Sequence, residues 1–187
     1  MEEKELVKLL KNGDKEAFDQ LYEKYKNVAL RMAYLICGNF SDSEDVVQES
    51  FIKCYQHITD LNKEEQFKSW FFQILTRTAW KYTKKQSKEL PEEEIISLMS
   101  DQKESSSLEV LLQKERDKGL MDMINHLSVK HRTTLVLYYY NELSTKEIAR
   151  ILGCLEGTVK SRLFIARKLL KKYIMEERNQ EELLYGK

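Results

Sequence analysis

The sequence predicts an all-α protein made of two small helical domains joined by a flexible acidic linker. Apolar residues recur at helical spacing along most of the chain, and no segment of any length alternates with the period of a β-strand. Charged residues make up 33% of the 187 residues and the chain contains a single proline, a composition typical of soluble helices. That proline, Pro91, lies in an acidic stretch between two basic ones, which is where we expect the linker.

The expected organisation has four segments. They are a first domain over residues 1–88, a linker over 89–117, a second domain over 118–175 and a charged tail over 176–187. Acidic and basic residues balance at 31 each, so the formal net charge is zero. The balance is uneven, because residues 63–88 and 142–172 are each net positive whereas residues 86–117 are strongly acidic. Two basic lobes around an acidic linker are typical of a nucleic-acid-binding protein, and the total charge hides them.

Two helix-start signals precede the aromatic part of the first domain. Asp14 can cap a helix in which apolar residues recur at helical spacing. Ser41 and Glu44 have the spacing of a capping box ahead of a helix over residues 45–55. The apolar residues that share one face of this second helix are Val47, Phe51, Cys54 and Tyr55. The side chains left to point mostly outward are Asp45, Gln48, Glu49 and Lys53. Taken alone, such a polar stripe is ordinary solvated surface.

A third helix, at about residues 67–85, is unusually aromatic. Its predicted buried stripe consists of Phe67, Phe71, Ile74, Leu75 and Tyr82. Trp80 falls on the far side of the helix, beside Gln73, Arg77 and Lys84. An exposed indole among cations is a platform on which an unpaired base can stack. Packing of the same indole on a neighbouring helix is the alternative.

Residues 144–164 predict a helix-turn-helix. Ser144 and Glu147 form a capping box, and Gly153 can adopt the left-handed conformation that ends the first helix. The inward stripe of that helix is Ile148, Ala149 and Leu152. A second helix that starts near Leu155 places four apolar residues on one buried face: Val159, Leu163, Ala166 and Leu170. A preceding helix, which Ser128 can cap, supports the pair.

The opposite face of the second helix predicts DNA contact. It carries Lys160, Ser161, Phe164, Ile165 and Lys168, with Arg162 and Arg167 on its two flanks. Side chains of these types can enter a major groove and read base edges, and the guanidiniums can hold phosphates. A basic solvated face on an ordinary amphipathic helix is the alternative, but the capping box and the turn glycine favour the DNA reader.

Several function classes are not supported by the sequence. The three cysteines are widely spaced, form no CxxC pair and have no histidine at ligand spacing, so we expect neither a disulfide framework nor a metal site. The three histidines are scattered and no glycine-rich phosphate loop occurs, so we expect neither an enzyme nor a cofactor. The charged N-terminus lacks the apolar core of a signal peptide and no apolar run approaches roughly 18 residues, so we expect a cytoplasmic protein that does not insert into a membrane.

The order of these motifs resembles the extracytoplasmic-function (ECF) group of bacterial RNA polymerase sigma factors, in the sigma-70 family. The resemblance covers residues 14–173. Its most specific pieces are residues 45–49 with Phe51, residues 67–71 and residues 157–163, in this order across an acidic linker. It implies a promoter-specificity subunit that binds core polymerase, recognises two promoter elements and helps to open the duplex.

The resemblance assigns a role to each set of candidate residues. In the family, the segment matching residues 45–58 binds the clamp helices of the largest polymerase subunit, which implicates Asp45, Gln48, Glu49 and Lys53. The segment matching residues 60–85 melts the minus-10 element, which implicates Phe67, Lys68, Trp70, Arg77, Trp80, Lys81 and Lys84. The helix-turn-helix reads the minus-35 element, which implicates Thr158, Lys160, Ser161, Arg162, Phe164, Arg167 and Lys168. The acidic linker resembles the segment that threads toward the polymerase active centre.

The implied partners are core RNA polymerase, promoter DNA and an anti-sigma factor, which in this family is often membrane-anchored. Three positions depart from the family pattern. Arg77 stands where many members have Asn, Leu155 where many have Pro or Ser, and Ile165 where a basic residue is common. The main alternative is a helix-turn-helix repressor or activator that is not a polymerase subunit, and a helical scaffold is a further one.

Overall fold

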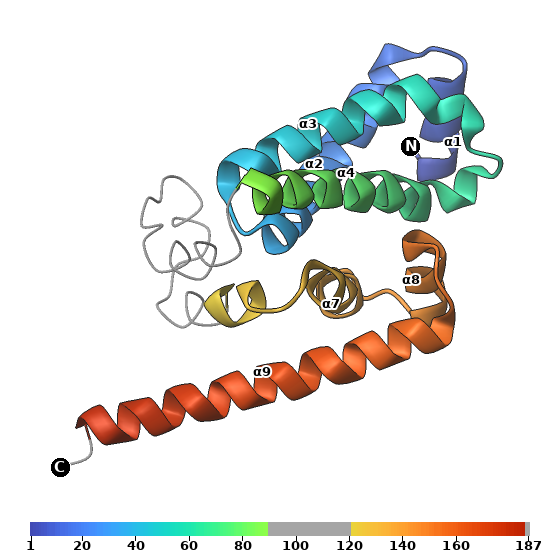
Figure 1. Ribbon diagram of the computed structural model, residues 1–187. Helices are drawn as coiled ribbons and strands as arrows, with labels where there is room; N and C mark the ends of the chain where they lie inside the picture. Colours follow the sequence, from blue (N-terminus) through green and yellow to red (C-terminus); the bar gives the residue numbers. More distant parts are fainter. Residues whose placement is uncertain (90–120, 186–187) are drawn as a thin grey trace. The chain divides into compact units, whose positions relative to one another are not determined.

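The computed structural model describes residues 1–89 and 121–185, which are helical almost throughout and contain no strand. The chain divides into two compact units, one built on α1 to α4 and one on α7, the first part of α8 and α9 (Figure 1). The predicted all-α fold is therefore confirmed for the described residues. The expected linker lies outside them, apart from the end of α4.

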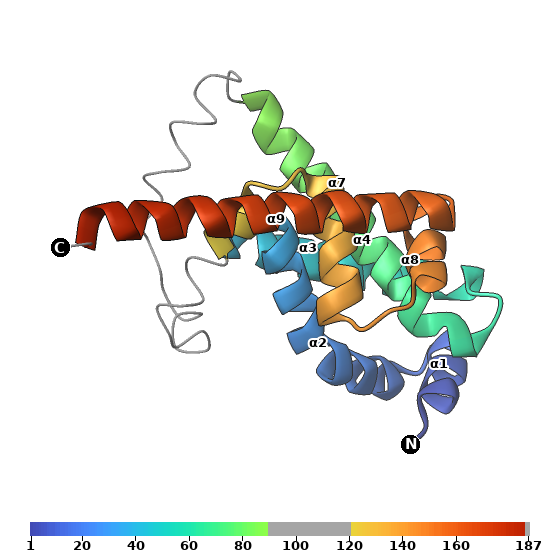
Figure 2. The same ribbon diagram turned by 90° about the horizontal axis from the view of Figure 1, so that it is seen from below.

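The N-terminal unit is a bundle of four helices. These are α1 (Glu3–Lys11), α2 (Lys15–Cys37), α3 (Phe40–His57) and α4 (Phe67–Glu89), with the short 3-10 turns η1 (Ile58–Asp60) and η2 (Glu64–Gln66) between α3 and α4. Helices α2, α3 and α4 pack against one another, and α1 lies against α2 and the two short turns (Figures 1 and 2). This arrangement leaves one face of α3 and one face of α4 at the surface.

Aromatic rings fill the centre of this unit. Tyr25 on α2 meets Phe67, Phe71 and Phe72 of α4 edge-on, with ring centroids 5.5, 5.7 and 6.3 Å apart. The Tyr25 hydroxyl donates a hydrogen bond to Glu3 Oε2 at 2.6 Å, which joins α1 to the core. Burial, and then this hydrogen bond, raise the pKa of Tyr25 well above its usual value. Phe72, absent from the predicted buried stripe, is fully buried because the core reaches α4 from two sides.

Asp14 caps α2 as the sequence predicts, since its carboxylate accepts the backbone N–H of Ala17 at 3.1 Å. Gly38 ends α2 in the left-handed conformation with φ of 83°, a backbone geometry that suits glycine. The next helix follows almost at once, and this short connection determines where α3 begins.

The predicted cap of α3 is wrong. The helix begins at Phe40, and Asn39 caps it by accepting the backbone N–H of Asp42 on its side-chain oxygen at 2.8 Å. Ser41 and Glu44 therefore lie within the first turns of the helix instead of forming its capping box. The physical reason is that Asn39 is already extended directly after the left-handed glycine, which allows α3 to start earlier than its serine signal suggests.

The C-terminal unit contains α7 (Val129–Leu135), the π-helical turn η3 (Val136–Tyr140), α8 (Thr145–Leu152) and α9 (Glu156–Tyr185). Residues 121–125 are also helical. Helix α7 packs against α9. Their shared core contains Leu127, Leu135 and Ala166, with Leu169, Leu170 and Tyr173 packed against it. Helix α9 continues as far as Tyr185, through most of the segment expected to be a separate tail.

The local signals of the helix-turn-helix are confirmed. The backbone N–H of Ser144 donates to Glu147 Oε2 at 2.9 Å, and the Glu147 N–H donates to Ser144 Oγ at 3.3 Å, which completes the capping box. Gly153 has φ of 62° and ends α8. Ser128 occupies the cap position of α7, but its hydroxyl bonds to His131 Nδ1 at 2.8 Å instead of a backbone N–H. A side-chain cap at Ser128 is therefore a prediction that the structure does not support.

The corrected start of α3 can be tested by stability. We expect Asn39→Ala to lower the free energy of unfolding by about 1 kcal/mol, because a backbone N–H loses its capping acceptor. Ser41→Ala should change it by less than about 0.5 kcal/mol. Urea unfolding followed by tryptophan fluorescence reports on this unit, because both tryptophans of the chain, Trp70 and Trp80, lie in α4. An equal or larger loss in the Ser41 variant would restore the sequence-based cap.

Candidate functional site

The polar stripe predicted on α3 divides into two parts. Asp45 and Gln48 are exposed, as expected. Glu49 and Lys53 turn toward α4, where Lys53 Nζ lies 2.8 Å from Glu49 Oε1 and donates to Thr78 Oγ1 at 3.0 Å. The prediction that all four point outward is therefore wrong for Glu49 and Lys53. A helical wheel gives the direction of each side chain but not the position of the neighbouring helix, which is why the sequence missed this pair.

The Glu49 carboxylate joins α3 to α4. Its Oε1 atom also lies 3.3 Å from Lys81 Nζ, so one carboxylate bridges a lysine of its own helix and a lysine of α4. The hydrogen bond from Lys53, followed by that from Lys81, lowers the pKa of Glu49 below its usual value. This contact holds the predicted polymerase-binding helix beside the predicted melting helix.

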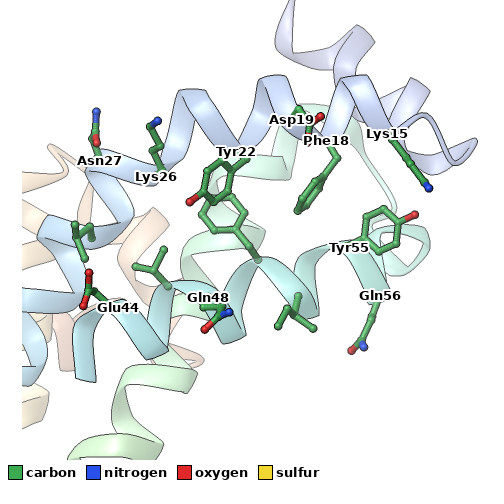
Figure 3. Close-up of a pocket in the computed structure, with 14 residues that line it drawn as sticks. Lys15, Phe18, Asp19, Tyr22, Lys26, Asn27, Glu44, Gln48, Tyr55 and Gln56 are labelled. Carbon is green, nitrogen blue, oxygen red and sulfur yellow. The ribbon is translucent and has the colours of Figure 1, made fainter. Parts of the chain in front are cut away.

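An open groove of about 810 Å³ runs between α2 and α3 on the side that carries Gln48 (Figure 3). Phe18 and Tyr22 line it from α2, and Ile52 and Tyr55 line it from α3. The sequence predicts Tyr55 on the apolar face of this helix, but the side chain is 43% exposed, with its ring centroid 5.3 Å from that of Phe18. Sequence analysis did not identify Ile52. Its spacing from Gln48 and Tyr55, four and three residues along the helix, was the available signal.

One of the predicted minus-10 residues is buried. Phe67 has 0% of its surface exposed and stacks on Phe71 with ring centroids 6.0 Å apart. Phe67 is therefore a packing residue, and its assignment as a DNA contact is corrected. Trp70 is half-buried beside it, with ring centroids 6.2 Å apart.

The remaining minus-10 candidates lie at or near the surface of α4. Lys68 is exposed near the start of the helix. Arg77, Lys81 and Lys84 are exposed, and Trp80 is half-buried. Residues 77, 80, 81 and 84 are spaced by three and four positions, so they line one face of the helix. An indole beside cations on one helix face is suited to holding an unstacked base and its phosphates. Ile74 and Tyr82, predicted to be core, are half-buried instead.

The helix that carries the minus-35 candidates buries the predicted face. Val159, Leu163 and Ala166 are buried, so the face opposite them is directed away from the core. The exposed residues of α9 include Lys160, Ser161, Phe164, Ile165, Arg167 and Lys168, whereas Thr158 and Arg162 are half-buried. Phe164 is 68% exposed, and Leu155, just before the helix, is 79% exposed. Exposed apolar side chains among cations are suited to contact with thymine methyl groups in a major groove.

Glu156 is a residue that sequence analysis missed. Its Oε1 atom accepts a hydrogen bond from Thr145 Oγ1 at 2.8 Å and lies 2.9 Å from Lys160 Nζ. The Lys160 hydrogen bond, and then that of Thr145, lower the pKa of Glu156. Glu156 thus joins the start of α8 to the start of α9 and orients one of the predicted DNA-contacting lysines.

Other kinds of site find little support in the described part of the chain. No group of three or more histidine, cysteine or acidic side chains is placed to hold a metal ion among the described residues. Within the same residues, no helix combines the length and apolarity needed to cross a membrane. Cys37 and Cys54 are buried, and burial raises the pKa of the Cys54 thiol to about 12.

Comparison with known proteins agrees with this division into two units. A family model described as Sigma-70 region 2 matches residues 21–89, and one described as Sigma-70, region 4 matches residues 118–170. The chain is 33% identical over 178 residues to the ECF RNA polymerase sigma-E factor of Haemophilus influenzae, covering 90% of this chain and 93% of that relative. It is 29% identical to the ECF RNA polymerase sigma factor SigW of Bacillus subtilis, covering 92% and 97%. The chain belongs to the ECF group of RNA polymerase sigma factors.

Two solved structures have a similar fold. The structure of CnrH in complex with the cytosolic domain of CnrY matches with a TM-score of 0.67 at 18% identity, covering 93% of this chain and 97% of that one. The sigma factor RpoE of Bartonella quintana, solved with the anti-sigma factor NepR, matches with a TM-score of 0.64 at 22% identity, covering 84% and 96%. At these identities the likeness concerns the fold.

The bridge between α3 and α4 generates a prediction about pH. Because the folded pKa of Glu49 is depressed, its stabilising contribution is present above the unfolded carboxyl pKa of about 4.3 and is lost as pH falls through the lower folded pKa. Glu49→Gln should therefore lower the free energy of unfolding at pH 7, by less than about 1 kcal/mol, and the difference from the unmodified chain should shrink below about pH 4.

The matched control is Glu44→Gln, an exposed carboxylate on the same helix. Its effect on unfolding should not follow the same pH dependence. Urea titrations at a series of pH values measure both variants. A Glu49→Gln difference that stays constant down to pH 3, or that the Glu44 variant reproduces, contradicts the bridge.

Proposed function

We propose that this chain is a promoter-specificity subunit whose two units grip the promoter at two points while α3 anchors it to core RNA polymerase. The observation that carries the proposal is the presence, in one chain, of sigma-70 region 2 and region 4 matches, each with an exposed face of suitable chemistry. A helix-turn-helix repressor or activator accounts for the C-terminal unit alone. It leaves the region 2 match over residues 21–89 without a role.

The proposed polymerase surface is the exposed part of α3. Asp45 and Gln48 supply polar contacts, and Ile52 and Tyr55 beside them supply apolar area along the groove. An apolar centre with a polar rim is the usual composition of a protein interface. Its proposed occupant is the clamp helices of the largest subunit. Glu49 and Lys53 support this surface from behind through their contacts with α4.

The proposed minus-10 surface is the face of α4 that carries Arg77, Trp80, Lys81 and Lys84, with Lys68 and Trp70 nearer the start of the helix. Opening a duplex costs a few kcal/mol for each unstacked base. Stacking on aromatic rings and neutralisation of phosphates by cations offset that cost. Both kinds of side chain lie on this face.

The proposed minus-35 surface is the outward face of α9. Lys160, Ser161, Phe164 and Lys168 are placed to enter a major groove, and the exposed Arg167 on the flank is placed for a phosphate, whereas the guanidinium of Arg162 is partly buried. The proposed location of the chain is the cytoplasm, because transcription takes place there. An anti-sigma factor is a further proposed partner. One structure of similar fold is a sigma factor solved in complex with an anti-sigma factor, which supports this proposal.

The two surfaces predict opposite failures. Asp45→Ala with Gln48→Ala should weaken association with core polymerase by about tenfold or more, because both are exposed polar residues of the proposed interface. Lys160→Gln, Ser161→Ala and Lys168→Gln together should leave core association unchanged and abolish promoter-specific transcription. Fluorescence anisotropy of the labelled chain measures association, and run-off transcription measures the second effect.

A control pair matches the first variant in chemistry. Glu16→Ala with Gln20→Ala removes an acid and an amide from the exposed surface of α2, away from the groove. It should behave as the unmodified chain in both assays. If the Asp45 and Gln48 variant binds core polymerase as well as the unmodified chain, the proposed anchor on α3 is wrong. If the α9 variant loses core association, α3 and α9 do not have the separate roles proposed for them.

A further inference from the structure

Two adjacent tyrosines of the C-terminal unit hold an arginine of α9. The Arg167 guanidinium carbon lies over the rings of Tyr138 and Tyr139, 5.7 Å from each centroid. The two rings are nearly perpendicular, with an interplanar angle of 78° and centroids 5.0 Å apart. Cation–π attraction operates at distances within about 6 Å of a ring centroid. The two rings form what we call the tyrosine cradle.

The backbone explains how consecutive residues come to face one cation. Tyr138 and Tyr139 lie in η3, where the Asn141 N–H donates to the Val136 carbonyl oxygen at 3.1 Å and closes a π-type turn. Such turns are rare in proteins, and those that occur are often found at functional sites. Val136 and Leu137 are buried, so the turn is anchored in the core beneath the rings.

The residue that follows the turn is also unusual. Glu142 adopts φ of 54°, the left-handed region that a glutamate seldom occupies. Backbone strain of this kind persists where the surrounding structure requires it, and it clusters at functional sites. Tyr138 is half-buried, whereas Tyr139 is 55% exposed and contributes little to the core, so packing alone does not account for the ring pair.

The cradle stands at the edge of the proposed minus-35 surface. Lys160, Phe164 and Arg167 follow one another at intervals of four and three residues, so Arg167 continues the row formed by the two groove-facing residues. Arg167 is exposed, and no carboxylate among the described residues forms an ion pair with it. A guanidinium held over ring faces keeps its N–H donors available, and a phosphate accepts them in a planar, paired geometry.

We infer that Tyr138 and Tyr139 are positioning residues that hold the Arg167 guanidinium ready for a DNA phosphate beside the minus-35 contact of α9. A free arginine side chain loses conformational entropy when it binds a phosphate. The cradle orders the side chain before binding, so less entropy is lost in the binding step. The inference rests on the proposed function, because the phosphate belongs to the promoter element that α9 holds.

The test uses holoenzyme, formed from the full chain and core polymerase, and a duplex that carries a promoter located by start-site mapping. Its affinity is measured over a series of KCl concentrations. Arg167→Gln should reduce the slope of log K against log [KCl] by about 0.9, the value for one phosphate contact. Tyr138→Leu with Tyr139→Leu should weaken binding about two- to fivefold and reduce the slope in the same direction. In the Arg167→Gln background, the leucine pair should add no further loss.

Tyr138→Phe with Tyr139→Phe keeps both ring faces and should restore the affinity and the slope. If the tyrosines were merely structural, the leucine pair would weaken binding without changing the slope, and it would weaken binding by the same factor in the Arg167→Gln background. Either of these two results overturns the inference, as does failure of the phenylalanine pair to bind as the unmodified chain does. Circular dichroism of each variant shows whether the helices are intact.

A second measurement is independent of the promoter. In the free chain, ¹⁵N relaxation of the Arg167 Nε–H group should show an ordered side chain, with order lost in the leucine pair and kept in the phenylalanine pair. Arg150, an exposed arginine of α8, is the internal reference and should be mobile. Equal mobility of Arg167 and Arg150 in the unmodified chain overturns the cradle. If unmodified holoenzyme does not bind the promoter at all, the proposed function fails, and the relaxation data still decide the cradle.

Discussion

Burial of the apolar side of each long helix is the constraint on which the rest of the structure depends. In α9, the buried row of Val159, Leu163 and Ala166 fixes which face is exposed, and that face is the proposed minus-35 surface. In α3 and α4, the aromatic core around Phe71 and Tyr25 plays the same part and leaves one exposed face on each helix, which are the two proposed partner surfaces of this unit. The hydrophobic effect buries the apolar side chains on one side of each helix, and the proposed partner surface is the side that remains exposed.

Polar contacts then adjust these faces. Glu49 links α3 to α4 through Lys81, so the proposed anchor to polymerase is connected directly to the proposed melting helix. Glu156 ties α9 to α8 and holds Lys160. These contacts are partly exposed and individually weak, and their value lies in orientation more than in stability. The tyrosine cradle at Arg167 has the same logic, since it places a charge without neutralising it.

Sequence analysis succeeded where the signal was local. Three features depend on neighbours within one or two helical turns, and the sequence predicts all of them. They are the capping box at Ser144 and Glu147, the turn at Gly153 and the buried face of α9. The failures depended on residues distant in the sequence or on competing local signals. Glu49 and Lys53 face α4 in a way that only packing determines, and Asn39 replaces Ser41 as the cap because a left-handed glycine precedes it. The helical spacing predicts the burial of Phe67 correctly, and only the DNA contact implied by the resemblance is wrong for it. The sequence thus predicts each group of candidate residues, whereas the structure is needed to tell which members are exposed and which are buried or paired.

The most direct test of the central claim is transcription. Purified chain is added to core RNA polymerase on fragmented genomic DNA from the organism that encodes it, and the 5′ ends of the run-off products are mapped. A two-point promoter grip predicts new start sites preceded by two shared sequence elements at one fixed spacing, the upstream one lost when the outward face of α9 is substituted. Start sites no different from those of core polymerase alone, or start sites that share only one element, would contradict the account.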